Sequence, residues 1–172
     1  PSVDNPSFIS IKDAAALFDK ENENYDNVIG TGLVFNGEER FYPFNMLVTR
    51  EIVNDVVGGQ PLAVTYCPLC GTGIVFNREV DGKVFEFGVS GMLWQSNLLM
   101  YNREENEENI SLWSQVLGEA VLGTHTGIKL EVVSSDVVRY SDWRQSYPDS
   151  QVLHTGRIGD PYNGDYYGVA KN

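Results

Sequence analysis

Short strand-like segments joined by tight turns constrain the fold of this chain most. Asn36-Gly37 stands between residues 28–35 and 40–44, two runs rich in apolar and aromatic residues. A type I′ turn needs a positive φ at both central residues, so an Asn-Gly pair here predicts a β-hairpin. Residues 62–66, 74–76 and 84–89 continue the pattern, with Asp81-Gly82 before the last run. They predict a three-strand meander.

Helical signals are few and short. Ser10 can cap a helix over residues 11–20, and residues 44–57 are compatible with a helix that Gly58-Gly59 ends. A third helix is expected after Ser141, ending before Pro148. Residues 92–101 predict a buried strand, and residues 112–113, 120–122 and 129–133 predict short ones. The expected fold class is mainly β or α+β, a compact domain of antiparallel hairpins and meanders with short peripheral helices.

Size and charge narrow the organisation and the partners. A chain of 172 residues with 42% hydrophobic content is expected to form one domain over residues 1–172. The formal net charge of −12 opposes a polyanion, which argues against a nucleic-acid partner. No stretch approaches the roughly 20 apolar residues that cross a bilayer, so we predict no membrane-spanning segment in this chain. Whether the partner is a small molecule or a protein stays open.

The two cysteines stand in the sequence Cys67-Pro68-Leu69-Cys70-Gly71. A pair spaced in this way chelates a metal, cycles between dithiol and disulfide, or closes a structural disulfide. In thioredoxin-like proteins a helix follows the first cysteine, whereas strand-like residues 74–76 follow this pair. The turn therefore looks more like the metal-binding knuckle of rubredoxins and zinc ribbons. Those sites use two knuckles, and this chain has one.

A metal at this turn needs further ligands. Zinc would take them from His125, His154, a carboxylate or another chain. Copper(I) prefers soft sulfur, which makes Met100 a candidate ligand. A lone histidine is more often structural, and a methionine more often part of the core. The expected cofactor is a copper or zinc ion, or none if the pair works by thiol exchange.

Five motifs together resemble an uncharacterised prokaryotic family, domain of unknown function 3179. The resemblance covers residues 28–153, with residues 1–27 as an N-terminal extension carrying the first helix and residues 154–172 as a tail rich in glycine and tyrosine. The motifs occur in the family's order, and they are Glu51-Ile52-Val53-Asn54-Asp55, Val64-Thr65-Tyr66-Cys67-Pro68-Leu69-Cys70-Gly71-Thr72, Phe87-Gly88-Val89-Ser90-Gly91, Ser96-Asn97-Leu98-Leu99-Met100-Tyr101 and Ser111-Leu112-Trp113-Ser114-Gln115.

The resemblance implies a location and a set of site residues but no settled activity. Members of the family are often exported or anchored, which implies an extracytoplasmic protein in an oxidising compartment and strengthens the disulfide alternative. The family pattern has a histidine before the glutamate of the first motif, where this chain has Arg50. The polar residues of the motifs form either a ligand pocket or a structural network: Glu51, Asn54, Asp55, Ser90, Asn97, Trp113, Ser114 and Gln115.

Three hypotheses follow for function. The first is a domain whose Cys67 and Cys70 bind copper or zinc or undergo thiol redox exchange. The second is a noncatalytic binding or structural module with a Cys67–Cys70 disulfide. The third is an enzyme that acts on a small molecule in a pocket beside the cysteine turn. The sequence alone does not decide whether the protein is an enzyme.

Overall fold

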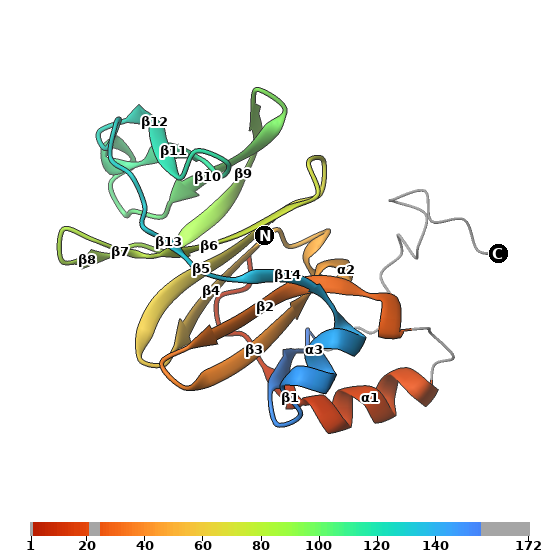
Figure 1. The fold of residues 1–172 in the computed structure, drawn as a ribbon. Coiled ribbons are helices and arrows are strands. Elements are labelled where there is room, and N and C mark those ends of the chain that lie inside the picture. Colours follow the sequence, from red (N-terminus) through yellow and green to blue (C-terminus); the bar gives the residue numbers. More distant parts are fainter. Residues whose placement is uncertain (1, 21–24, 156–172) are drawn as a thin grey trace.

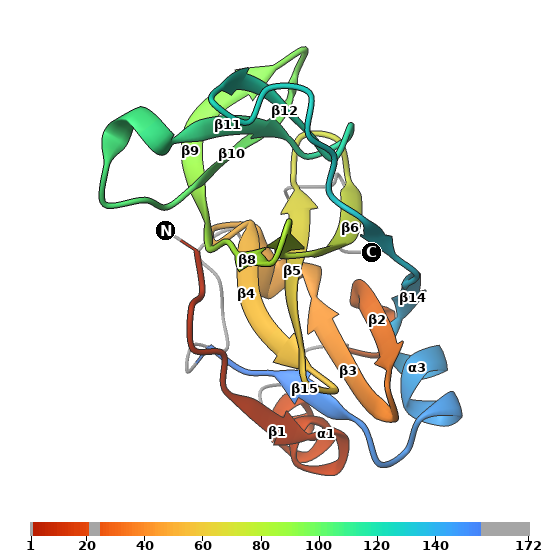
Figure 2. The same cartoon turned by 90° about the vertical axis from the view of Figure 1, so that its left-hand side faces the viewer.

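Three β-sheets lie one above another in the computed structural model, which describes residues 2–20 and 25–155 (Figures 1 and 2). The middle sheet has the order β13-β6-β5-β4 and lies between a five-stranded sheet, β1-β15-β3-β2-β14, and a four-stranded sheet, β12-β11-β10-β9. A two-stranded ribbon, β7-β8, stands apart. The prediction of a mainly β fold built from antiparallel hairpins is therefore confirmed.

The middle sheet contributes side chains to two cores. It consists of β4 (Ile52–Val57), β5 (Gln60–Cys67), β6 (Thr72–Asn77) and β13 (Val132–Val133). Successive residues of a strand point to opposite faces, so Leu62, Val64 and Tyr66 of β5 pack in the core shared with the five-stranded sheet. Ala63 and Cys67 pack in the core shared with the four-stranded sheet. The first cysteine thus lies between two sheets.

The five-stranded sheet contains the hairpin predicted at Asn36-Gly37. Its strands are β1 (Phe8–Ser10), β2 (Ile29–Phe35), β3 (Glu38–Pro43), β14 (Asp136–Arg139) and β15 (Gln151–Leu153). Asn36 and Gly37 have φ of 47° and 83°, as a type I′ turn requires. The β15–β3 pair is parallel, and β15 lies between β3 and β1.

Helices cover the outer face of this sheet. They are α1 (Ile11–Lys20) and α3 (Tyr140–Ser146), and the short 3₁₀ turn η1 (Tyr25–Asn27) lies beside them. Ser10 caps α1 as predicted, since its Oγ accepts a hydrogen bond from the backbone N of Asp13 at 3.0 Å. Trp143 of α3 packs with Phe41 and Val152 of the sheet. The first and third predicted helices are confirmed.

The four-stranded sheet forms the other outer layer. Its strands are β9 (Phe87–Trp94), β10 (Asn97–Asn102), β11 (Ser111–Ser114) and β12 (Glu119–Gly123), with η2 (Glu107–Asn109) in the acidic loop between β10 and β11. The expected single buried strand over residues 92–101 is wrong. Gln95 and Ser96 have φ of 50° and 65°, so the chain reverses there, and the apolar residues before them are exposed at a hairpin tip.

The helix predicted over residues 44–57 is also wrong. Only α2 (Phe44–Leu47) is helical, and Ile52–Val57 is strand β4. Glu51 has a left-handed φ of 57°, which ends the helical run. The following segment is rich in β-branched residues and pairs with β5 along its length. Alternating burial between two sheets satisfies such residues better than one helical face does.

The predicted meander over residues 62–89 holds only for its first two strands. β6 ends at Asn77, and Asp81-Gly82 joins β7 (Glu79–Val80) to β8 (Lys83–Val84) rather than β6 to a third strand. The chain then enters the outer sheet as β9. Arg78 is buried and stabilises the segment that passes from the middle sheet to the outer sheet. Its guanidinium donates to the carbonyls of Leu62, Phe85 and Asp55.

No helix in residues 2–20 or 25–155 is long and apolar enough to cross a bilayer. The tail predicted from residue 154 lies outside the described residues, apart from its first two positions.

Candidate functional site

The cysteine pair occupies a tight turn between two strands, as the sequence predicts. Strand β5 ends at Cys67 and β6 begins at Thr72. The backbone N of Cys70 donates to the carbonyl of Cys67 at 3.2 Å, and Gly71 follows with a φ of 62°. Because a left-handed residue costs glycine little, Gly71 lets the chain return directly into β6. The two thiols therefore stand on the same short loop.

The two thiols are free, close together and differently exposed. Their sulfur atoms are 3.0 Å apart. Cys67 is buried between the sheets, whereas Cys70 is exposed. Burial, with a smaller contribution from the hydrogen bond to Cys70, raises the pKa of the Cys67 thiol, because a thiolate loses solvation away from water. The exposed sulfur is thus the one that an external reactant can approach.

Two buried amides fix the surroundings of Cys70. Asn97 Nδ2 lies 3.4 Å from Cys70 Sγ and donates to Gln115 Oε1 at 2.9 Å. The side-chain oxygen of Asn97 accepts from the backbone N of Val116. The Gln115 amide nitrogen is shared between Thr65 Oγ1 and the Thr72 carbonyl, both at 3.2 Å. The amides therefore tie the β5–β6, β9–β10 and β11–β12 turns together.

Asn97 and Gln115 were predicted as site residues, whereas Thr65, Thr72 and Ser96 were not. The Ser96 carbonyl lies 3.4 Å from Cys70 Sγ, close enough to accept from the thiol. Thr65 stands two positions before Cys67 and faces the same side of β5, so the alternation of a strand could have found it. Thr72 and Ser96 lie inside the family motifs, which is the signal that could have found them, although their contacts depend on which turns meet.

The other motif residues of the outer sheet take structural roles. Ser90 Oγ donates to the Leu99 carbonyl, and Ser114 Oγ accepts from the backbone N of Leu117. Trp113 is fully buried, and its indole N donates to Asn102 Oδ1 at 3.0 Å. Each of these bonds stabilises a hairpin of the sheet.

Asn54 and Asp55 lie on β4, and Glu51 lies just before it. All three are away from the amides of Asn97 and Gln115. Asn54 faces the four-stranded sheet, where it donates to the Phe87 carbonyl and accepts from the Phe87 backbone N. It thereby joins β4 to β9. Asp55 points to the opposite face because it is the next residue of the strand. Glu51 lies in the turn before β4, and partial burial raises the pKa of its carboxyl.

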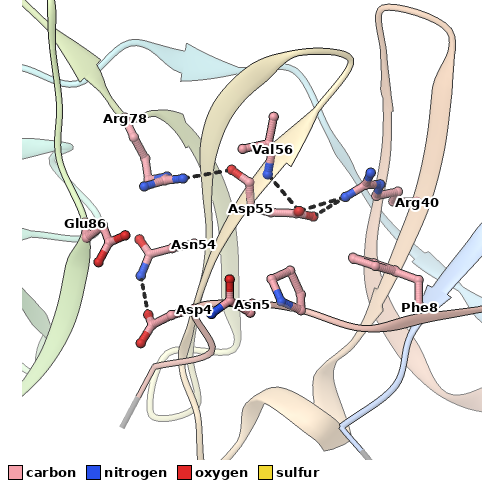
Figure 3. A pocket seen from close by; sticks show the side chains of 10 residues that line it. Asp4, Asn5, Phe8, Arg40, Asn54, Asp55, Val56, Arg78 and Glu86 are labelled. Atoms are coloured by element: carbon pink, nitrogen blue, oxygen red, sulfur yellow. Dashed lines mark hydrogen bonds and ion pairs between the residues drawn. The ribbon is translucent and has the colours of Figure 1, made fainter.

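Asp55 is the centre of a second polar region, the Asp55 cluster, which we define as Asp55, Arg40, Tyr42 and Glu38. Figure 3 shows Asp55 and Arg40 of this cluster. Arg40 Nη1 lies 2.7 Å from both carboxylate oxygens of Asp55. The Tyr42 hydroxyl donates to the same carboxylate at 2.7 Å. Burial raises the pKa of Tyr42 well above its usual value, and the Asp55 charge adds to the shift.

A cavity of about 430 Å³ opens beside the Asp55 cluster (Figure 3). Its charged lining groups have partners within the protein: Asp55 binds Arg40, Arg78 donates to backbone carbonyls, and Asp4 pairs with Arg103 at 2.7 Å. Removing one partner from a buried charge pair such as Asp55–Arg40 leaves the other charge unpaired and costs stability. These pairings indicate that the residues of this region connect two sheets.

The candidate metal ligands are spread over the molecule. His125 Nδ1 lies 3.0 Å from Ser111 Oγ, and its ring packs against Phe85 and Trp113. Met100 is fully buried in the same core as Cys67. His154 lies after β15, where its backbone N donates to the Ser7 carbonyl. In the part of the chain that the structure describes, no group of three or more His, Cys, Asp or Glu side chains is arranged to hold a metal ion.

Comparison with known proteins gives one match. A family model described as "Protein of unknown function (DUF3179)" matches residues 1–171, which extends on both sides of the motif-bearing residues 28–153. No curated protein and no solved structure matches the chain.

Proposed function

Because the chain belongs to this family of proteins of unknown function, DUF3179, we infer its activity from the geometry of the site, and we propose that Cys67 and Cys70 exchange electrons with a partner by thiol–disulfide exchange. The observation that carries the proposal is a pair of free thiols 3.0 Å apart, one exposed and one buried. An exchange site needs an accessible sulfur to meet the partner and a second sulfur within bonding reach to resolve the intermediate.

The exposures assign different roles to the two cysteines. A partner thiolate attacks Cys70 Sγ of the oxidised protein, the Cys67–Cys70 bond breaks, and Cys67 leaves as a thiolate that takes up a proton. The partner's second thiolate attacks the partner sulfur of the mixed disulfide and releases Cys70, which is protonated in turn. Two electrons and two protons pass from the partner dithiol to the protein. The reverse sequence reduces a partner disulfide.

The order of roles is opposite to that of a pair capping a helix. There the first cysteine is activated by the helix N-terminus, whereas here the first cysteine ends a buried strand and the second is exposed. The Asn97 amide that points at Cys70 Sγ supplies a hydrogen-bond donor to this sulfur.

Metal binding is the second candidate function, because the cysteine turn supplies only two ligand atoms. Two thiolates supply half of a tetrahedral zinc site, and in the described residues no third His, Cys, Asp or Glu side chain is grouped with them. Exchange needs only the two thiols present, whereas a closed metal site needs ligands from elsewhere. Met100, buried in the same core as Cys67, is the candidate soft ligand for copper(I).

A redox titration with a metal assay tests the proposal. The protein is purified without chelator or affinity-tag metal, and free thiols are counted across glutathione and dithiothreitol buffers. We expect reversible interconversion between two thiols and none, and a trapped mixed disulfide at Cys70 in Cys67→Ser. Stoichiometric copper or zinc that is lost in the Cys67→Ser, Cys70→Ser double variant would replace exchange by metal binding. Permanent oxidation in every buffer would replace it by a structural disulfide.

The cellular location is proposed on the family resemblance alone. We place the protein outside the cytoplasm, where a partner dithiol or disulfide meets an oxidising environment. Alkylation of free thiols in fractionated cells tests this placement. Recovery of the protein with the cytoplasmic fraction would contradict it.

A further inference from the structure

The turns around Cys70 carry exposed, uncharged apolar side chains, a set which we call the collar and define as Leu69, Met92, Leu93, Trp94, Val116 and Leu117. Each of these side chains is between 42% and 60% exposed. The three segments that carry them, residues 66–73, 90–97 and 114–118, contain no acidic or basic residue. In a chain with a net charge of −12, such a surface is set apart from its surroundings.

Hydrogen bonds place the collar next to the reactive sulfur. Leu69 precedes Cys70 in the turn. The Ser96 carbonyl, two residues after Trp94, lies 3.4 Å from Cys70 Sγ. Val116 follows Gln115 and donates its backbone N–H to Asn97, whose amide lies 3.4 Å from the same sulfur. The β5–β6 and β9–β10 turns lie at the same end of the molecule (Figure 2).

Buried hydrogen bonds hold the turns that carry the collar. The amides of Asn97 and Gln115 are buried and hydrogen-bonded to all three turns. Turns that are already ordered lose little backbone entropy when a partner covers them. The partner gains by bringing apolar side chains, because burial of apolar surface is favourable and does not depend on direction.

Charge decides between two sources of the reacting sulfur. Glutathione is anionic, and the long-range field of this acidic protein repels it, while the collar segments offer no cation to bind its carboxylates. A polypeptide whose cysteine is flanked by apolar, uncharged residues meets no such cost. We infer, resting on the proposed function, that the partner of Cys70 is a polypeptide cysteine in an apolar segment rather than an anionic small-molecule thiol.

Rates of exchange with matched disulfides test this inference. The probes are a short peptide with leucines beside a disulfide-bonded cysteine, the same peptide with aspartates in place of the leucines, oxidised glutathione, and the neutral reagent bis(2-hydroxyethyl) disulfide. We expect the reduced protein to react at least tenfold faster with the apolar peptide than with the acidic peptide or glutathione. The preference over the neutral reagent persists in 0.5 M salt, because it comes from apolar contact rather than charge.

Variants of the collar locate the preference. Trp94→Ser with Leu117→Ser is expected to lower the ratio of apolar-peptide rate to neutral-reagent rate at least fivefold. Val137→Ser is the matched control, since Val137 is 57% exposed on β14 in the five-stranded sheet, and it leaves the ratio unchanged. A thermal melt of each variant confirms that it is folded.

The outcomes separate the two proposals. If no disulfide reacts at Cys70, the exchange function itself is wrong. If the neutral reagent reacts but the apolar peptide has no advantage, or glutathione matches it, only the inference about the partner is wrong. Sedimentation with neutral phosphatidylcholine vesicles that protects Cys70 would assign the collar to a membrane surface. A dimer that protects Cys70 would assign it to a second copy, and either result overturns the peptide partner.

Discussion

The cysteine turn and the Asp55 cluster depend on neighbouring strands of one sheet and use their polar groups in opposite ways. In the cluster, the buried carboxylate of Asp55 is bound by Arg40 and Tyr42. In the turn, neutral amides hold the loops while the Cys70 sulfur stays exposed. Paired buried charges brace a fold, whereas an accessible thiol held beside a second thiol is suited to chemistry. Four measurements test this division, and the largest expected effect comes first.

Asp55→Asn should destabilise the protein by about 3 to 5 kcal/mol, because it leaves the Arg40 charge buried without its main partner. The side chains of Asp55 and Arg40 are 5% and 14% exposed. Urea unfolding measures the loss. Glu38→Gln is the matched control, since the Glu38 side chain is 45% exposed and its pair with Arg40 should contribute at most about 1 kcal/mol. Equal losses in the two variants would contradict the structural role of Asp55.

Cys70 should react with iodoacetamide at least about 100-fold faster than Cys67 in the folded, reduced protein, because reagents reach exposed thiols first. Mass spectrometry of timed samples measures both rates. In urea the two rates should converge, which controls for intrinsic reactivity. Faster labelling of Cys67 in the folded state would reverse the proposed roles of the two sulfurs.

Gln115→Ala should cost about 1 to 3 kcal/mol of stability, because it leaves buried partners without hydrogen bonds. The bonds lost are those to Asn97, Thr65 and Thr72. The exposed glutamine Gln145 on α3 supplies the control, since Gln145→Ala should change the unfolding free energy by less than about 0.5 kcal/mol. If the two substitutions cost the same, the amides do not hold the turns together.

Alkaline pH should weaken the reduced protein more than the oxidised one, and we expect this effect to be the smallest. Burial raises the pKa of Cys67 above its unfolded value, so the folded dithiol holds this proton more tightly. The resulting stability is complete below the unfolded pKa and is lost as pH rises through the folded pKa. The raised pKa of Tyr42 affects both forms and cancels in their difference.

Urea unfolding of both redox forms at several pH values between 7 and 10 measures this difference. The stability of the oxidised form relative to the reduced form should increase with pH. A difference that is constant over this range would show that Cys67 titrates alike in the folded and unfolded states.

Local rules predicted the elements whose causes are local. The Asn36-Gly37 turn, the Ser10 cap and the strand-flanked cysteine turn each depend on a few adjacent residues. The failures share a different cause. Residues 52–57 form a strand because two other sheets cover both of their faces, and residues 92–94 are exposed because the chain reverses at Gln95 and Ser96.

The candidate site residues also divide into those whose grouping the sequence motifs predicted and those whose grouping depended on the tertiary structure. The sequence motifs contain Cys67, Cys70, Asn97 and Gln115, and the structure brings these four together. The same motifs contain Asn54 and Asp55, which alternation along β4 sends to opposite faces. Their spacings of three and four residues from Glu51 would place these side chains on one face only if the segment were helical, and this segment is a strand.

The sequence by itself determined a β-rich chain and a cysteine pair on a turn between strands, because turn chemistry and alternation act over a few residues. Only the tertiary structure decided which cysteine is buried, which amides hold the turns and which apolar residues stay exposed around Cys70. Those properties arise where one sheet covers another, and contacts between segments distant in the chain determine that arrangement.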